Sequence, residues 1–186
     1  MNKELEISLS LNDVRHLIAT EGYIELGMYQ DADAELERID PFCRVFPPVL
    51  ALKLCIYAGL RKWELMQTVA QKMARHDPSN IQWAIFWALA TRQVQSIEAA
   101  RAILLGALEM NPNEPTIHYN LSCYESRLHH FKQARRHLAR AIQLDNRFRL
   151  IALDDHDLEP LWKKIGRPQV WNQPRDREQE YDYEYE

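Results

Sequence analysis

Glycine is scarce in this chain of 186 residues, where it occurs five times. Folds with many tight turns, and loops that hold phosphate groups, depend on glycine because it adopts backbone conformations that other residues avoid. The sequence also has no uninterrupted run of about 18 apolar residues, which argues against a membrane-spanning helix. We therefore expect a globular chain with few tight turns and no membrane insertion.

Cysteine is equally rare, and Cys43, Cys55 and Cys123 are too far apart to form a Cys-x-x-Cys pair. An odd number of widely spaced cysteines is typical of reduced thiols rather than of disulfides or a metal site. The stretch Met1-Asn2-Lys3-Glu4-Leu5-Glu6 is charged and lacks the apolar segment of a secretory signal. We expect a cytoplasmic protein that uses no metal and no cofactor.

Neither sign of charge predominates strongly, because the chain has 23 lysines and arginines and 27 aspartates and glutamates, which gives a net charge of −4. This balance gives no general attraction to nucleic acid, so no specific nucleic-acid partner is expected. The charges are nevertheless uneven along the chain. Residues 1–46 carry ten acidic and four basic side chains, whereas residues 127–149 carry seven basic side chains and one acidic one.

What the sequence does contain is a repeat of 34 residues, in which four apolar columns recur without an insertion. The columns are Tyr29, Trp63, Ile97 and Phe131; Ala32, Met66, Ala100 and Ala134; Leu36, Ala70, Leu104 and Leu138; and Ile39, Met73, Ala107 and Ala141. Within a unit they stand at offsets that place them on one face of an α-helix. A second apolar stripe in the first half of each unit predicts another helix, so each unit is expected to be an antiparallel helix pair.

The repeat units resemble the tetratricopeptide (TPR) family over roughly residues 13–146. The resemblance rests on Ile117-His118-Tyr119-Asn120-Leu121, Phe131-Lys132-Gln133-Ala134 and Ala141-Ile142-Gln143-Leu144-Asp145 in the last unit, on Ala99-Ala100-Arg101 and Ala107-Leu108-Glu109-Met110-Asn111-Pro112 in the third, and on Gly27-Met28-Tyr29-Gln30-Asp31-Ala32 in the first. It implies an all-α, right-handed superhelical solenoid of antiparallel helix pairs, in which neighbouring units share a continuous core.

The same period sets the expected boundaries along the chain. They are an N-terminal extension (1–12), four helix pairs (13–46, 47–80, 81–114 and 115–146), a helical C-terminal cap (147–166) and a mobile, acidic, tyrosine-rich tail (167–186). The cap resembles a closing segment that follows bacterial TPR arrays. It is expected to end in a helix near residues 157–165 with Asp157 as its N-cap.

The resemblance implies that the first helix of each unit lines a concave groove. The groove residues are Leu17, Glu21, Ile24, Ala51, Cys55, Ala58, Ile85, Leu89, Arg92, Tyr119, Asn120, Cys123 and Arg127. Asn120 alone matches the carboxylate clamp with which some TPR proteins bind acidic chaperone tails, so such a clamp is not expected. Apolar residues in the middle of the groove favour a partner helix or an extended segment with apolar anchors. The sequence therefore predicts a protein-interaction module.

Two alternatives remain beside this prediction. The size and mode of binding are comparable with those of the small cytoplasmic TPR chaperones of bacterial type III secretion. The groove is covered by the chain itself in the second alternative, either by the alternating segment Ile7-Ser8-Leu9-Ser10-Leu11 or by the tail, or it serves a homodimer.

No catalytic motif is found. His129, His130 and His137 lack the His-Glu-x-x-His spacing of a zinc site and are interpreted as solvated residues of a turn and a helix. The run Asp154-Asp155-His156-Asp157 lacks the glycine and the final glutamate of a calcium loop, so capping and solvation are expected there. An enzyme is not expected.

A basic patch is the last candidate surface. It consists of Lys132, Arg135, Arg136 and Arg140, of which three recur at a spacing of four residues on the last repeat helix. Such a stripe suits an acidic protein, an anionic membrane or a nucleic acid, but a solvated convex face is favoured because charge runs usually are solvated.

Overall fold

The computed structural model describes residues 9–166, and every element in this part of the chain is a helix. The elements are α1 (Leu11–Glu25), α2 (Tyr29–Leu36), α3 (Pro47–Gly59), α4 (Trp63–His76), α5 (Ile81–Val94), α6 (Ile97–Met110), α7 (Pro115–Arg127), α8 (Phe131–Leu144), α9 (Phe148–Asp154), a short 3-10 helix η1 (His156–Leu158) and α10 (Glu159–Ile165). The predicted tail and most of the predicted N-terminal extension lie outside the described residues.

The 34-residue period appears directly in the helix starts. The second helices of the four units begin at the large apolar column of Tyr29, Trp63, Ile97 and Phe131. Three residues later, the column of Ala32, Met66, Ala100 and Ala134 is fully buried. The predicted columns therefore do form the buried face of α2, α4, α6 and α8, because small or flexible side chains there let neighbouring helices approach closely.

The first helix begins at Leu11, inside the segment expected to be an N-terminal extension. Ser10 and Asp13 form a capping box, in which the Ser10 hydroxyl accepts from the Asp13 amide at 3.1 Å and the Asp13 carboxylate accepts from the Ser10 amide at 3.0 Å. The second Asp13 oxygen accepts from the backbone amide of Asp40 at 2.9 Å. This contact fastens the start of α1 to the turn that follows α2.

The turn inside each unit follows the same period. Gly27, Arg61 and His129 stand 34 or 68 residues apart and have positive φ angles of 71°, 56° and 61°. Glycine adopts this left-handed conformation without steric cost, whereas arginine and histidine do not. In the third unit α5 extends to Val94 and Ser96 caps α6 by accepting from the Ala99 amide at 3.1 Å, so the left-handed residue is not needed.

Glycine is required once more, at the contact between the first two units. A Cβ at Gly59, the last residue of α3, would fall on the ring of Tyr29, the first residue of α2. The missing side chain therefore lets the Tyr29 ring lie directly on the α3 backbone. This close approach sets the spacing between α2 and α3.

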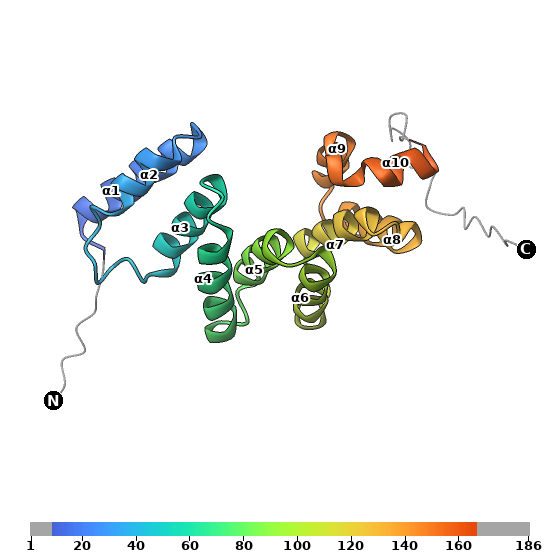
Figure 1. Ribbon diagram of the computed structural model, residues 1–186, viewed down its shortest axis with the longest axis horizontal. Coiled ribbons are helices and arrows are strands. Elements are labelled where there is room, and N and C mark those ends of the chain that lie inside the picture. The colour runs from blue at the N-terminus through green and yellow to red at the C-terminus, as the bar shows by residue number, and fades with distance from the viewer. Residues whose placement is uncertain (1–8, 167–186) are drawn as a thin grey trace, which may run out of the picture.

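Figure 1 shows the helix pairs following one another in chain order, so that α1 and α10 lie at opposite ends of an elongated array. The helices α4 and α6 lie along one side (the lower edge in this view), whereas α3, α5 and α7 lie nearer the other side. Buried residues form three clusters along the array rather than one central core. None of the helices between residues 9 and 166 is long and apolar enough to cross a membrane.

The cap differs from the prediction in one respect. The final helix α10 begins at Glu159, and the residue that caps the preceding 3-10 turn is Asp155, whose carboxylate accepts from the Asp157 amide at 2.8 Å. The prediction that Asp157 caps this segment is therefore wrong. The Asp157 side chain is instead held by arginine side chains of the repeat array.

Candidate partner-binding surface

The predicted groove residues lie at positions that repeat every 34 residues along α1, α3, α5 and α7, and we call this surface the inner face. In the first three units its apolar members are half-buried; they are Leu17, Ile24, Ala51, Cys55, Ala58, Ile85 and Leu89. In the fourth unit the equivalent residues Tyr119 and Cys123 are 8% and 4% exposed. The inner face thus has an open part on α1, α3 and α5 and a covered part on α7.

The covered part is closed by the beginning of the cap. The ring of Phe148 in α9 stacks on that of Tyr119, with centroids 4.6 Å apart. The Tyr119 hydroxyl donates to Asp155 Oδ2 at 2.6 Å, and the Cys123 thiol lies 3.5 Å from the same oxygen. The chain therefore covers part of its own inner face, but with residues 148–157, which were not predicted to do so.

The two groove arginines lie against one carboxylate of the cap. Arg92 in α5 makes a bidentate ion pair with Asp157, in which Nη2 donates to Oδ1 at 2.7 Å and Nη1 donates to Oδ2. Arg127 at the end of α7 reaches the same group, with Nε 3.8 Å from Oδ1. Of the two arginines at the basic end of the groove, Arg92 is therefore neutralised within the chain, whereas Arg127 shares the same carboxylate and stays exposed.

The rest of the cap is anchored by apolar packing. Leu158 and Leu161 are fully buried, and Trp162 is 6% exposed with its indole N–H donating to the Ala152 carbonyl at 3.0 Å. These residues belong to one cluster with buried residues of α6, α7 and α8. The cap therefore shields the apolar end of the last unit as well as part of its inner face.

Burial changes the protonation behaviour of the groups under the cap. Burial and the hydrogen bond to Asp155 raise the pKa of Tyr119 above its ordinary value, and burial raises the pKa of Cys123 far above that of a free thiol. Burial also raises the pKa of Tyr124 to about 12, and its ring lies 5.5 Å from the Arg92 guanidinium. The phenols and the thiol are therefore neutral at physiological pH and act as packing and hydrogen-bonding groups.

The opposite end of the inner face is acidic and open. Glu21 and Glu25 on α1 are exposed, and neither makes an ion pair with a residue in the described part of the chain. Two neighbouring acids, Asp33 of α2 and Glu37 just after it, are already used, because Lys53 Nζ lies 2.7 Å from a carboxylate oxygen of each. The free negative charge on the inner face therefore comes from α1.

Asn120, the single match to a carboxylate clamp, is used within its own helix. Its side-chain amide donates to the Thr116 carbonyl at 2.8 Å, and the residue is half-buried. Together with the engaged arginines, this geometry leaves no set of free donors for an acidic peptide among the groove residues of the fourth unit.

The interpretation of the histidines as solvated holds for His129 and His130 but is wrong for His137, which is 8% exposed. His137 in α8 meets His118 in α7, with the two Nδ1 atoms 3.0 Å apart, and His118 Nε2 lies 3.0 Å from the Pro112 carbonyl. Burial, and then the neighbouring His118, lower the pKa of His137 to about 4. The sequence did not predict this pair, because polar residues at helical spacing do not indicate a contact between two helices.

A second buried polar group, Glu125, lies next to these histidines. Its side chain is 1% exposed and accepts from Arg101 Nε at 2.6 Å, while its other oxygen lies 2.7 Å from His130 Nδ1. A carboxylate buried this deeply needs such partners, because an unpaired buried charge is strongly destabilising. The contacts join α6, α7 and the turn before α8, so the group is a structural tie. Among residues 9–166, no set of three or more His, Cys, Asp or Glu side chains is placed to hold a metal ion.

The basic patch lies on α8. Lys132, Arg135 and Arg136 are exposed and make no ion pair with a described residue, whereas Arg140 is half-buried and donates to Gln143 Oε1 and Asn113 Oδ1, both at 2.6 Å. Three of the four predicted residues are therefore available to an acidic partner.

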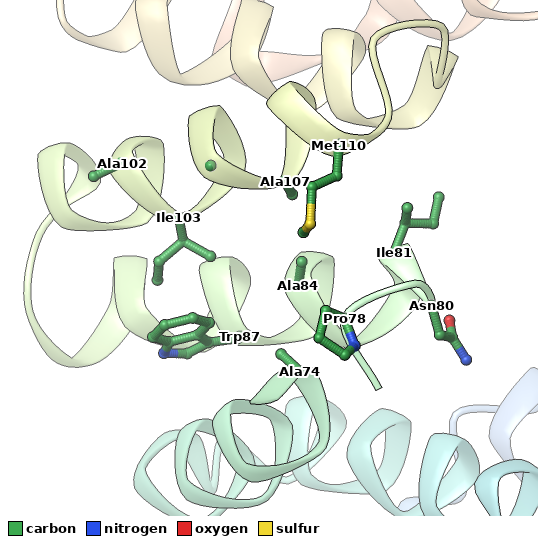
Figure 2. A pocket seen from close by; sticks show the side chains of 11 residues that line it. Ala74, Pro78, Asn80, Ile81, Ala84, Trp87, Ala102, Ile103, Ala107 and Met110 are labelled. Atoms are coloured by element: carbon green, nitrogen blue, oxygen red, sulfur yellow. The ribbon is translucent and has the colours of Figure 1, made fainter. Parts of the chain in front are cut away.

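One surface feature was not predicted, an apolar pocket of about 510 Å³ between α4, α5 and α6. Figure 2 shows Met110, Ala107 and Ile103 of α6 facing Ala84 and Trp87 of α5 across it. The remaining lining residues are Ala74, Pro78, Asn80, Ile81, Ala102 and Gly106. Small side chains on facing helices leave this space, and it opens on a face of α5 other than the one that carries Ile85 and Leu89.

The fold is similar to that of solved MamA structures. The structure named MamA AMB-1 C2221 is 18% identical in sequence and superposes with a TM-score of 0.55 over 85% of this chain and 91% of that chain. MamA MSR-1 C2 is also 18% identical and gives a TM-score of 0.56 over 84% and 88%. MamA is a TPR-fold protein, so the prediction of an all-α, TPR-like solenoid of antiparallel helix pairs is confirmed at the level of the fold. No family model and no curated protein matches the sequence.

Proposed function

We propose that the protein is a protein-interaction module, which holds an apolar segment of a partner against the open inner face of α1, α3 and α5. The observation that carries this proposal is the difference between the repeat units. Residues 148–157 already occupy the inner face of the fourth unit, which supports the idea that this face accepts a peptide segment, while the equivalent residues of the first three units are only half-buried.

The chemistry of the surface limits the kind of partner segment that we expect it to bind. Ile85 and Leu89 offer apolar contacts, and the neighbouring inner-face residues Cys55 and Ala58 are small. Acids at the first unit and the internal neutralisation of Arg92 disfavour an acidic peptide. We expect a partner helix or extended segment with apolar anchors and without a run of acidic residues.

Binding rather than catalysis is favoured by the use of the polar groups. Asp155, Asp157 and Glu125 are all engaged in contacts within the chain, and the buried thiol of Cys123 has a raised pKa, which weakens it as a nucleophile. Cys43, Cys55 and Cys123 form no disulfide with one another, which fits the cytoplasmic location that we propose.

The experiment is a selection of peptides from a phage-displayed random library on the full chain, followed by affinity measurements with variants. Ile85→Glu and Leu89→Glu place a charge on the open inner face and are expected to weaken binding about tenfold or more. Leu65→Glu, the same change at an exposed leucine of α4 that belongs neither to the inner face nor to the apolar pocket, is the matched control and leaves binding unchanged. Equal affinities for the wild type and both inner-face variants, all shown to be helical, would overturn the proposal.

A further inference from the structure

The N-terminal end of the array has an uncovered helix face. In α5, Trp83 and Phe86 are 1% and 8% exposed because they pack in one cluster with Met66 and Ala70 of the preceding α4. The residue of α1 that corresponds to Phe86, two periods earlier, is Ile18. Within residues 9–166 no helix precedes α1, and Ile18 is 61% exposed. This face receives a helix in every later unit and has none here.

More apolar surface lies at the same end of the molecule. Leu11, which lies seven residues before Ile18 on the same side of α1, is 72% exposed. Phe42, in the turn after α2, is 77% exposed. The Asp13 contact to the Asp40 amide holds that turn beside the start of α1. We call the apolar surface of Leu11, Ile18 and Phe42 the N-terminal face. Residues 9–46, which include α1, α2 and this turn, carry eight acidic and three basic side chains. The exposed acids among them that make no ion pair with a described residue are Glu21, Glu25, Asp31 and Asp40.

The C-terminal end has the opposite charge. Residues 127–166 carry nine basic and five acidic side chains. The exposed cations that lack an ion pair with a described residue are Lys132, Arg135, Arg136 and Lys164. Apolar side chains are exposed here too, since Leu150 and Ile151 of α9 are 72% and 52% exposed. We call this surface, on α8, α9 and α10, the C-terminal face.

We propose that the protein associates head to tail with further copies of itself, the N-terminal face of one copy docking on the C-terminal face of the next. Each face combines exposed apolar residues with net charge, and the two charges are of opposite sign. Contact between two N-terminal faces would bring like charges together, which is unfavourable. Because a head-to-tail contact leaves one face free at each end, the copies form open chains rather than a closed dimer. The apolar residues of the inner face, on which the proposed function depends, take no part, so the two proposals can fail independently.

The first measurement is the mass of the full chain by sedimentation velocity over a range of concentrations. The average mass is expected to rise with protein concentration at low salt and to fall towards that of the monomer when sodium chloride is added, because exposed charges are screened. A monomer at every concentration overturns the proposal. So does a monomer that associates when residues 167–186 are removed, since the acidic tail would then be the occupant of the C-terminal face.

Two variants decide which faces meet. Ile18→Lys puts a cation on the N-terminal face, and Ile151→Glu puts an anion on the C-terminal face. Each is expected to raise the dissociation constant about tenfold or more. Mixed in equal amounts they retain one intact face each and are expected to form a discrete dimer. Leu65→Lys, at an exposed leucine of α4, is the control and leaves association unchanged.

The alternatives give different results in the same experiment. Association through two N-terminal faces would leave Ile151→Glu dimeric on its own, and association through two C-terminal faces would leave Ile18→Lys dimeric. Failure of the mixture to associate while the wild type does would also contradict a head-to-tail contact. Circular dichroism of each variant establishes that it is folded.

Discussion

The first and last units of the array end in different ways. At the C-terminus, α9, η1 and α10 cover α7 and α8 with fully buried leucines, whereas at the N-terminus α1 exposes Ile18 on the face that receives a helix elsewhere. A stacked array needs something at each end, because each unit buries its apolar surface against a neighbour. The difference teaches that residues 9–166 supply a cap for the C-terminal end of the array and no corresponding helix for the N-terminal end.

Removal of the cap should make the two ends alike and gives the largest expected effect. Trp162→Ala deletes a buried side chain and its hydrogen bond to Ala152, which is expected to lower the free energy of unfolding of the C-terminal half by about 3–5 kcal/mol. Cys123 should then become accessible to a thiol reagent, whereas in the wild type only the half-buried Cys55 is expected to be more accessible than the buried Cys43 and Cys123. A Cys123 that stays protected after the substitution would show that the cap does not depend on Trp162.

Gly59 allows the comparison to be tested from the N-terminal side. Gly59→Ala is expected to lower the free energy of unfolding by about 1–3 kcal/mol, because the new methyl group collides with the Tyr29 ring. Gly106→Ala in α6 is the matched control, since nothing lies within 4 Å of the new Cβ, and it should raise helix stability slightly. The measurement is urea unfolding followed by circular dichroism. Equal effects of the two substitutions would exclude the collision as the cause.

Acid should weaken the last unit through His137. Its pKa in the folded protein, about 4, lies below the ordinary value of 6.5, so the unfolded chain binds the proton first as the pH falls. The contribution of His137 to the free energy of unfolding is complete above its ordinary pKa and decreases as the pH falls towards its pKa in the folded protein. About 2 kcal/mol of this contribution is lost between pH 7 and pH 5. Urea unfolding at both pH values measures this loss. His137→Gln keeps a side-chain amide that can hydrogen-bond to His118 and does not titrate. The loss should therefore be smaller by that amount, and an unchanged pH dependence would assign it to other groups.

The smallest effects concern the left-handed turn residues. Arg61→Gly is expected to raise the free energy of unfolding by up to about 1 kcal/mol, because glycine relieves the strain of a positive φ, and Gly27→Ala is expected to lower it by about as much. Thermal unfolding of the two variants measures both changes. Shifts in the same direction would contradict the assignment of these positions as equivalent.

The sequence predicted the repeat architecture because that architecture is local and periodic. Small and large apolar residues recur at the buried positions of four helices, and a proline or a capping residue marks most helix starts. The periodicity could not predict the contacts of Asp157 with Arg92 and of His137 with His118, because these contacts are made by polar side chains that do not recur at a fixed spacing. The one available signal was charge: the acidic residues in 154–157 could have been matched with the two arginines predicted for the groove.

The cap also gives the inner face a direction. A segment lying along α1, α3 and α5 meets Asp157 and the stacked rings of Phe148 and Tyr119 when it reaches α7. A long polypeptide therefore cannot run through from one end of the molecule to the other along this face. The surface suits the terminus of a chain, or a segment that turns back. The length of segment that it can hold corresponds to three repeat units rather than four.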